Sequence, residues 1–210
     1  LTYVAPHIPK WRPVKTKRIK IGLVSEYFRQ HTIGKLYEGL IQNLDRGRFE
    51  VVLFHAPAAA RDFLRQRLDA MVDKAVDLPL GFPAMHAAVA AEQLDVLFYP
   101  DIGMSPTTYY LAFARLAPVQ AVSWGHPDTT GLDTIDYFLS SAAVEPPEAD
   151  AAYTETLIRL PRLPCCYAAT SLPEERPSRT ALGLPATGRL YGCPQTLWKI
   201  HPEFDQVLAD

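Results

Sequence analysis

The sequence predicts an α/β fold in which a doubly wound parallel sheet is covered by helices on both faces. Short runs rich in Val, Ile and Leu alternate with segments whose apolar residues recur at helical spacing. These runs are apolar throughout, which is typical of strands buried on both faces, and each ends at a polar loop. About six such strands alternate with helices, so we expect a Rossmann-like lobe.

The first strand is predicted at Ile19–Ser25, where IKIGLVS forms a compact apolar run. A helix is expected over residues 34–44 because Leu36, Leu40 and Leu44 recur on one helical face. A second strand at residues 51–55 completes a βαβ unit.

The same alternation continues along the rest of the lobe. The predicted elements are a helix at 62–72, a strand at 75–78, an alanine-rich helix at 83–93, a strand at 95–99, a helix at 107–116, and strands at 119–124 and 135–139.

Prolines and basic residues mark the expected boundaries of this lobe. Residues 1–18 form a basic, proline-containing leader, and the Rossmann-like lobe spans residues 19–145. Residues 146–183 are rich in proline and contain one predicted strand, Thr156–Leu160, so we expect the connection between two lobes there.

A second lobe is expected to begin at residue 184. A strand is predicted at residues 189–193 and a helix at 202–208, after which the sequence stops at Asp210. One strand and one helix cannot bury a hydrophobic core. We therefore expect residues 184–210 to be the start of an incomplete second domain.

Composition indicates a globular protein and limits its partners. The chain has 48% hydrophobic residues, 21% charged residues and a net charge of -2, which is unlike a nucleic-acid-binding domain. The leader is locally basic, and we interpret it as a solvated linker rather than a site for phosphate or an acidic partner. The cations of the leader are Lys10, Arg12, Lys15, Lys17 and Arg18, and Lys20 follows them in the first predicted strand.

The three cysteines indicate a reducing compartment. Cys165, Cys166 and Cys193 are odd in number and lack the spacing of a zinc site, so we expect reduced thiols in a cytoplasmic protein. No apolar run is long enough to span a bilayer and none resembles a signal peptide, so no membrane partner is expected.

Loops after the strands are the first places to look for a site, because ligands of open α/β sheets bind beyond the carboxyl ends of the strands. The informative loops are residues 26–31, 100–105, 125–131 and 194–199. A dehydrogenase is disfavoured, because the first strand is followed by SEYFRQH without a GxGxxG motif or an acidic residue placed to hold a ribose.

Four motifs lie in or beside these loops and together carry a resemblance. SEYFRQHTIGKL, RLAPVQAVSWGHPDTTGLDTIDYFLSS, YTETLIRLP and CPQTLWKIHP occur in this order. The chain resembles bacterial relatives of protein O-GlcNAc transferase, a family of inverting, two-lobed enzymes that includes the N-glucosyltransferases of adhesins. The resemblance covers nearly all of residues 19–210. It implies an amino-terminal, acceptor-side lobe of GT-B type, followed by the start of a nucleotide-sugar-binding lobe.

The implied reaction is inverting transfer of GlcNAc or a hexose from a UDP-sugar to a protein or peptide acceptor. A Ser/Thr hydroxyl or an Asn amide would attack the anomeric carbon in line, and UDP would leave. No cofactor and no metal ion are expected, and no DxD-like motif appears. The 210-residue segment alone is expected to be inactive. The sugar, the acceptor atom and the oligomeric state are left open.

His31, Asp101 and Lys199 are the candidate catalytic residues under this resemblance. His31 matches a histidine that projects into the cleft of the family, where an imidazole with a pKa of about 6.5 can take a proton from an acceptor or orient it. Its structural alternative is a bond within its own turn. Asp101 would hydrogen-bond an acceptor or His31. The alternative is that either Ser105 or Asp101 caps the next helix, since Pro106 suits a first helical turn.

His126, Thr129 and Thr130 are candidate substrate-binding residues in the GHPDTTG loop. The bacterial and N-glucosyltransferase-like members have histidine where O-GlcNAc transferases proper have tyrosine, so His126 favours a bacterial kinship. The threonines offer hydroxyl groups to a ligand. Equally, they hold a loop shaped by Pro127 and Gly131.

Lys199 and Gln195 are the candidate donor contacts. Lys199 matches a lysine that contacts the nucleotide diphosphate, where an ammonium stabilises the charge of the leaving group. Gln195 lies near a position of uridine or phosphate contacts, with spacing to Lys199 one residue longer than in animal enzymes. Trp198 between them is predicted to be a core aromatic. The alternative to an enzyme is a non-catalytic remnant that binds peptides or nucleotides.

Overall fold

The computed structural model describes residues 3–13, 17–57, 59–169 and 174–209. The chain divides into two compact units, Leu1–Ala169 and Thr170–Asp210. Within the described residues, no helix is both long enough and apolar enough to cross a membrane.

The first unit contains a seven-stranded, wholly parallel sheet in the order β3-β2-β1-β4-β5-β6-β7. This arrangement confirms the α/β fold and its doubly wound sheet. The strands are β1 (Ile19–Ser25), β2 (Phe49–His55), β3 (Lys74–Asp77), β4 (Val96–Tyr99), β5 (Val119–Val122), β6 (Tyr137–Ser141) and β7 (Thr156–Leu160).

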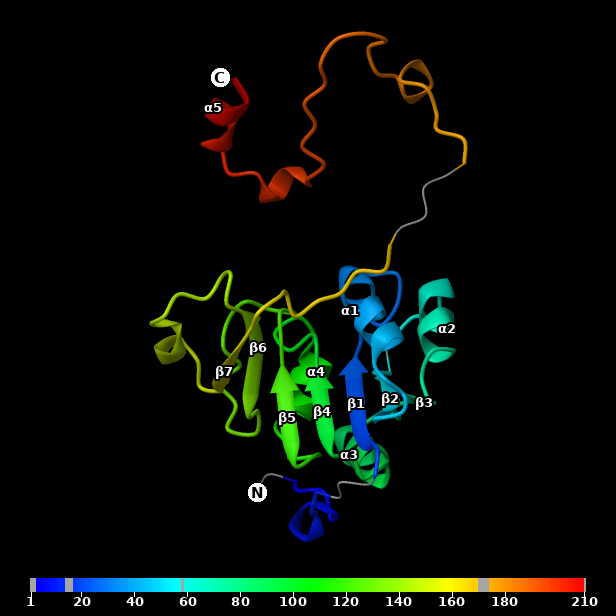
Figure 1. Cartoon of the computed structure of the whole chain (residues 1–210), viewed down its shortest axis with the longest axis vertical. Helices are drawn as coiled ribbons and strands as arrows, with labels where there is room; N and C mark the ends of the chain where they lie inside the picture. Colours follow the sequence, from blue (N-terminus) through cyan, green and yellow to red (C-terminus); the bar gives the residue numbers. More distant parts are fainter. Residues whose placement is uncertain (1–2, 14–16, 58, 170–173, 210) are drawn as a thin grey trace. The chain divides into compact units, whose positions relative to one another are not determined.

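Helices join the strands and cover both faces of the sheet (Figure 1). Those of the first unit are η1 (Ile8–Lys10), α1 (Thr32–Asn43), α2 (Phe63–Asp69), α3 (Phe82–Ala91), α4 (Pro106–Leu111) and η2 (Ala149–Ala152).

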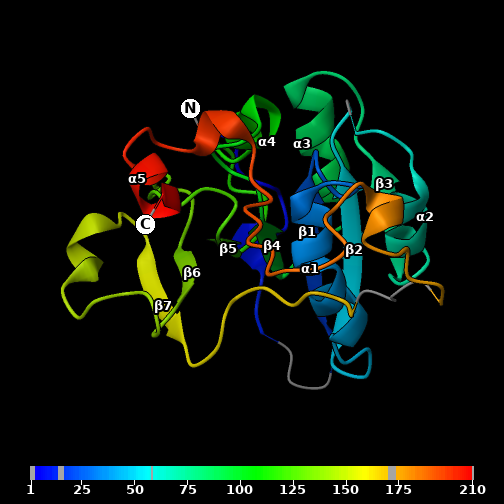
Figure 2. The same cartoon turned by 90° about the horizontal axis from the view of Figure 1, so that it is seen from above.

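Two hydrophobic cores lie on opposite faces of the sheet because side chains alternate along each strand. Leu23 of β1 belongs to the core under α1 and α2, whereas the next residue, Val24, belongs to the core under α3 and α4. In β4, Phe98 belongs to the core under α1 and α2, and its neighbour Leu97 belongs to the core under α3 and α4. Figure 2 shows the resulting layers, with the sheet between the two pairs of helices.

The segment after β7 crosses α1 and is bound to it. The backbone N–H of Gly39 donates to the carbonyl of Cys166 at 2.9 Å, and the N–H of Cys166 donates to the carbonyl of Leu36 at 2.9 Å. A Cβ atom at Gly39 would lie 2.4 Å from that Cys166 oxygen. Glycine is therefore required where the segment passes the helix.

The boundary of the first unit differs from the expected one at residue 145. The strand Thr156–Leu160 is confirmed, but it is the seventh strand of the sheet and pairs with β6 over five residues. The proline-rich stretch before it therefore remains part of the first unit, which extends to Ala169.

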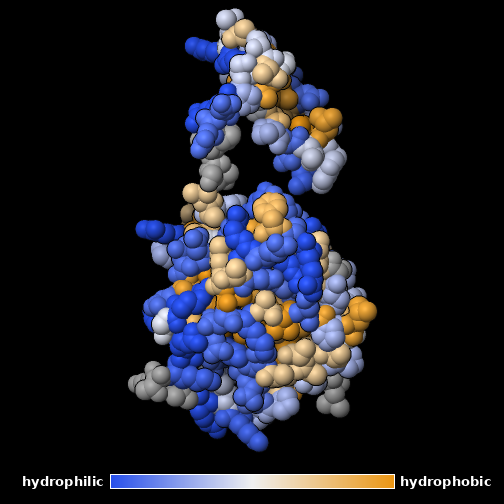
Figure 3. Space-filling model, turned by 90° about the vertical axis from the view of Figure 1, so that its right-hand side faces the viewer, coloured by the Kyte–Doolittle hydropathy of each residue, from blue (hydrophilic) through white to orange (hydrophobic). Residues whose placement is uncertain are grey.

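The described residues of the second unit, 174–209, form three short helical segments and include no buried residue. They are η3 (Thr180–Leu182), η4 (Leu197–Lys199) and α5 (Phe204–Ala209), so the predicted helix is confirmed. The strand predicted at residues 189–193 is wrong, because these residues have no strand partner in the described chain. Trp198 is 80% exposed, so its interpretation as a core aromatic is also wrong. Exposed hydrophobic groups of this unit are visible in Figure 3.

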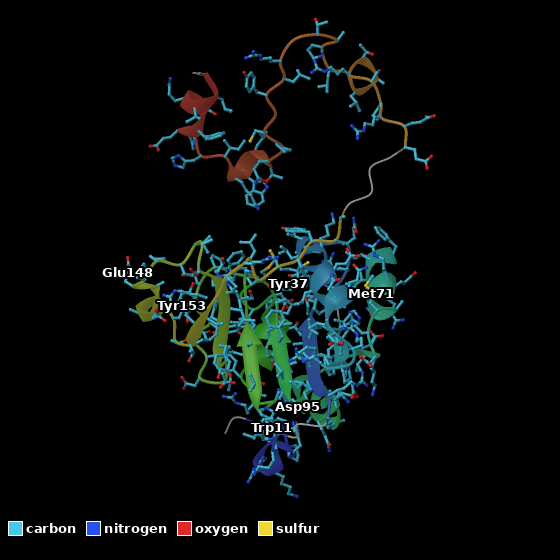
Figure 4. The ribbon with its side chains drawn as sticks, viewed as in Figure 1. Trp11, Tyr37, Met71, Asp95, Glu148 and Tyr153 are labelled. Atoms are coloured by element: carbon cyan, nitrogen blue, oxygen red, sulfur yellow. The ribbon has the colours of Figure 1, made fainter. Side chains whose placement is uncertain are left out.

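The leader is attached to the amino edge of the sheet rather than being a free linker. The indole Nε1 of Trp11 donates to Asp95 Oδ1 at 2.5 Å, and these two side chains adjoin one another in Figure 4. His7 Nε2 lies 3.0 Å from the carbonyl of Leu94. Lys10 and Arg12 remain exposed, and Lys15 lies outside the described residues.

Candidate functional site

The crevice expected for a ligand lies beyond the carboxyl ends of β1 and β4. The chain runs from β1 to β2 and β3 on one side, and then returns to place β4 on the other side of β1. Ligands of doubly wound sheets bind at this reversal of strand order. The loops after β1, β4 and β5 therefore form the candidate site.

Asp101 is fully buried and joins the loops that follow β4 and β1. Its Oδ2 accepts hydrogen bonds from Ser25 Oγ at 2.8 Å and from the Glu26 N–H at 3.0 Å. Its Oδ1 is buried without a hydrogen-bond partner among the described residues. Burial, with a smaller contribution from the charge of Glu26, raises the pKa of Asp101 to about 6 against the opposing hydrogen bonds. Asp101 therefore ties two loops together.

Ser105, and not Asp101, caps α4. Ser105 Oγ accepts the N–H of Thr108 at 3.5 Å, and Pro106 occupies the first turn of the helix. The same hydroxyl donates to Glu26 Oε2 at 2.5 Å. The expectation of a cap with a following proline is confirmed for Ser105 alone, because the carboxylate of Asp101 is directed to the β1 loop instead.

His31 lies at the carboxyl edge of the sheet as the N-cap of α1. Its Nδ1 accepts the N–H of Ile33 at 3.2 Å, and its ring stacks on Tyr27 with centroids 4.4 Å apart. Burial and the charge of Arg29 lower the pKa of His31, which favours a neutral ring. In a neutral imidazole that accepts at Nδ1, the proton is on Nε2. This tautomer donates a hydrogen bond to a ligand rather than removing its proton.

Two hydrogen bonds and one ring stack connect Asp101 to His31 indirectly. Ser25 Oγ donates to Asp101 and accepts the N–H of Tyr27 at 2.8 Å, and Tyr27 stacks on His31. No hydrogen bond joins His31 directly to Asp101 or His126 within the described residues. The loops after β1 and β4 are thus linked through Ser25 and Tyr27.

His126 lies in the loop after β5 and packs against the loop after β4. A Cβ atom on Gly125 would lie 2.1 Å from the carbonyl oxygen of Pro100, so the two loops are in direct contact. Gly103, with φ +94°, packs in the same way against the His126 ring. The His126 side chain is 44% exposed, and its Nδ1 lies 3.4 Å from Asp128 Oδ2. Its side chain is thus partly open to solvent and is not tied up by a buried partner among the described residues.

Thr129 and Thr130 form hydrogen bonds with a buried carboxylate, Glu155, which was not among the residues predicted from the sequence. Thr129 Oγ1 donates to Glu155 Oε2 at 2.6 Å, and both the N–H and the hydroxyl of Thr130 donate to Glu155 Oε1. Glu155 is 5% exposed. The threonines thus hold the loop, and a ligand role for them stays a prediction. The YTETLIRLP motif contained the signal, an acidic residue immediately before a strand.

Lys199 and Gln195 lie exposed in the second unit. Lys199 ends η4, and its Nζ lies 5.1 Å from the centroid of the Trp198 ring. Gln195 Oε1 accepts the N–H of Thr196 at 2.9 Å. No carboxylate forms an ion pair with Lys199 in the described part of the chain. The roles of Lys199 and Gln195 toward a donor stay predictions.

The described residues include no group of three or more His, Cys, Asp or Glu side chains that could hold a metal ion. The described cysteines Cys165, Cys166 and Cys193 are free thiols.

Comparison with known proteins identifies relatives along most of the chain. An Arabidopsis thaliana protein named probable UDP-N-acetylglucosamine–peptide N-acetylglucosaminyltransferase SEC is 26% identical over 209 residues, covering 93% of this chain and 21% of the relative. The UDP-glucose:protein N-beta-glucosyltransferase of Actinobacillus pleuropneumoniae serotype 7 (strain AP76) is 33% identical over 113 residues, covering 54% of this chain and 18% of that protein.

A solved structure shares the fold. A mutant of Thermobaculum terrenum O-GlcNAc transferase superposes with a TM-score of 0.68 at 30% identity, covering 73% of this chain and 30% of that one. The chain thus spans about a fifth of the length of the curated relatives it matches. Residues 4–164 match glycosyl transferase family 41. The expected resemblance is confirmed, and this chain belongs to glycosyl transferase family 41.

Proposed function

We propose that this chain is the acceptor-side part of an enzyme that transfers a sugar from a UDP-sugar to a protein side chain with inversion. The observation that carries the proposal is the meeting of the β1, β4 and β5 loops at the switch point, with His31 and His126 at its rim. The names of the relatives supply the substrate classes, a UDP-sugar donor and a protein or peptide acceptor.

In this mechanism His31 positions the acceptor. Its Nε2–H donates a hydrogen bond to the acceptor oxygen, because Nδ1 is engaged by the Ile33 N–H. The acceptor atom attacks the anomeric carbon, the bond from that carbon to the UDP oxygen breaks, and the acceptor proton passes to solvent or to the departing phosphate. Asp101 acts through Ser25 and Tyr27, and not on the acceptor itself.

Lys199 supplies the charge that balances the leaving diphosphate. Its ammonium is exposed and is the first positive group of the second unit's predicted donor loop. The mechanism then needs no metal ion. We place the reaction in the cytoplasm, on the strength of the free thiols of Cys165, Cys166 and Cys193.

The second candidate is a binding remnant without turnover. It is considered because Lys199 and Gln195 are exposed and could hold a nucleotide without any transfer step. One measurement on the product of the complete open reading frame distinguishes the two candidate functions. That protein is incubated with UDP-GlcNAc or UDP-glucose and peptides that contain Ser, Thr or Asn, and the products are identified by mass spectrometry.

A β-linked glycopeptide from the α-linked donor would support inverting transfer, with the linkage read from the anomeric proton coupling by NMR. Saturable UDP binding without any glycopeptide would favour the binding remnant. An α-linked product would contradict the inverting mechanism while leaving the glycosyltransferase assignment intact. The 210-residue chain serves as the control and should transfer no sugar.

A further inference from the structure

Glu155 is a buried carboxylate whose hydrogen bonds all come from neutral groups. Oε1 accepts the N–H of Thr130 at 2.9 Å and the Thr130 hydroxyl, while Oε2 accepts the hydroxyls of Thr129 at 2.6 Å and Thr154 at 3.2 Å. Thr129 Oγ1 in turn accepts the N–H of Thr154 at 3.0 Å. The stretch before β7 and the loop after β5 are therefore joined by the Glu155 side chain and by a direct contact between Thr129 and Thr154.

Such an arrangement favours the charged form of the carboxyl group at this position. Burying a carboxylate is costly unless its oxygens are hydrogen-bonded, and bonds to a charged oxygen are stronger than neutral ones. Burial opposes ionisation of Glu155, but the hydrogen bonds from Thr129 and Thr130 outweigh it and lower the pKa. Glu155 is thus ionised at neutral pH and holds its donors in place.

The loop of residues 125–131 is consequently fixed at both ends. At its start, Gly125 touches the backbone of Pro100 and Asp101, and Gly103 touches His126. At its end, Glu155 binds Thr129 and Thr130. His126 lies between these two attachments, and its side chain is partly open to solvent. Release of either attachment frees the backbone that carries His126.

We propose that Glu155 is a positioning residue of the sugar-transfer site, which holds His126 in place by clamping Thr129 and Thr130. The role in sugar transfer rests on the proposed function, whereas the hydrogen bonds from Thr129 and Thr130 to Glu155 do not. Glu155 does not touch a substrate, because both of its oxygens are buried and bound to the loop.

The matched control is Glu145, another carboxylate of the same region. Glu145 Oε1 accepts the hydroxyls of Ser140 at 2.6 Å and Tyr153 at 2.9 Å, without a bond to residues 125–131. Glu145→Ala therefore removes a carboxylate that accepts two hydroxyl groups near β7, as Glu155→Ala does, but leaves the clamp intact. Glu155→Gln keeps an acceptor for the Thr130 N–H and offers an amide to the Thr129 hydroxyl, so it should rescue part of the effect.

The first experiment uses the 210-residue chain and needs no activity. Amide hydrogen exchange of residues 125–131 and the imidazole ¹⁵N shifts of His126 are measured for wild type, Glu155→Ala, Glu155→Gln and Glu145→Ala. In Glu155→Ala, the exchange rates of the loop amides should rise about tenfold or more relative to those of the sheet amides, and the His126 signals should shift. Unchanged loop exchange and His126 signals, or equal changes in Glu145→Ala, would overturn the proposal. If Glu155→Ala fails to fold, Thr130→Val removes one clamp hydroxyl and takes its place.

The second experiment uses the product of the complete open reading frame. Glu155→Ala should lower kcat for peptide glycosylation about 100-fold, the scale of a misplaced reacting group, with UDP affinity within about twofold of wild type. Glu155→Gln should be intermediate. Normal kcat despite a loosened loop would overturn the positioning role. If the wild-type protein transfers no sugar, the proposed function fails, and the exchange experiment still decides whether Glu155 positions His126.

Discussion

Gly103 and His126 are in such close contact that a Cβ atom on Gly103 would lie 2.7 Å from the Cβ of His126. The first residue lies in the loop after β4 and the second in the loop after β5. Gly103 also has φ +94°, a conformation that side chains disfavour. The place of His126 is therefore set by a residue that has no side chain.

Gly103→Ala should destabilise the first unit through both the clash and the backbone strain. We expect the free energy of unfolding to fall by about 2–4 kcal/mol, measured by urea denaturation. Gly81→Ala is the control, because Gly81 has φ +86° and nothing within 4 Å of its added Cβ. That variant should lose only about 1–2 kcal/mol from strain. Equal losses in the two variants would show that contact with His126 contributes nothing.

Gly39→Ala should also destabilise, although the same change in a helix usually stabilises by about 0.5–1 kcal/mol. An alanine methyl would lie 2.4 Å from the carbonyl oxygen of Cys166 and displace the segment after β7. We expect faster hydrogen exchange at the Cys166 N–H, with Lys35→Ala on the exposed side of α1 as the control. A stabilised variant with unchanged exchange would contradict the contact.

Asp101→Asn should gain stability relative to wild type as the pH rises. The pKa of Asp101 is raised to about 6 from an ordinary 3.8, so the folded protein binds this proton more tightly than the unfolded chain. Wild type therefore loses stability as Asp101 ionises between about pH 4 and pH 6, by about 3 kcal/mol in total. Asparagine cannot ionise. Urea unfolding from pH 4 to pH 8 measures the free energy of unfolding of both proteins. The variant should gain about 3 kcal/mol relative to wild type over this range. A difference that stays constant with pH would refute the raised pKa of Asp101.

His31→Ala should lose about 1 kcal/mol of stability, because the N-cap of α1 disappears. His31→Asn should remain close to wild type in stability, since asparagine is a strong N-cap, but it removes the imidazole. In the complete enzyme both variants should depress transfer to peptide while leaving UDP affinity nearly unchanged. Full activity of the asparagine variant would assign His31 to capping alone.

Lys199→Ala in the complete enzyme should lower kcat by roughly two to three orders of magnitude, as expected when a transition state loses one electrostatic contact. Lys199→Arg should rescue poorly, because a planar guanidinium does not replace a compact ammonium. Steady-state rates with saturating UDP-sugar give the measurement. An alanine variant with near-normal turnover would remove Lys199 from the mechanism.

The elements of the fold were predictable because the spacing and the runs of apolar residues reflect which faces of a helix or strand are buried. Leu23 and Val24 lie in a continuous apolar run, and the structure divides them between the two cores. The length of the first unit was not predictable, because prolines before β7 gave no sign that Thr156–Leu160 pairs with β6. The strand expected at residues 189–193 failed for a related reason. A strand requires a partner, and sequence pattern alone does not supply one.

The candidate site was predictable only in part. The rule that ligands bind beyond strand ends placed His31, Asp101 and His126 at one edge. The direction of each hydrogen bond was not available from the sequence. Asp101 binds Ser25, and the threonines bind Glu155. These partners could not be predicted, because they lie 76 and about 25 residues away along the chain.

The docking of the leader through Trp11 and Asp95 has a practical consequence for handling the protein. It holds the amino-terminal segment at the opposite edge of the sheet from His31 and His126, a separation of roughly 20 Å for the seven residues of β1. A fluorophore on the exposed Lys10 side chain would lie at this amino edge, on the other side of the sheet from the loops that carry His31 and His126. Binding of a peptide to those loops, as proposed above, could then be tested with the label kept away from them.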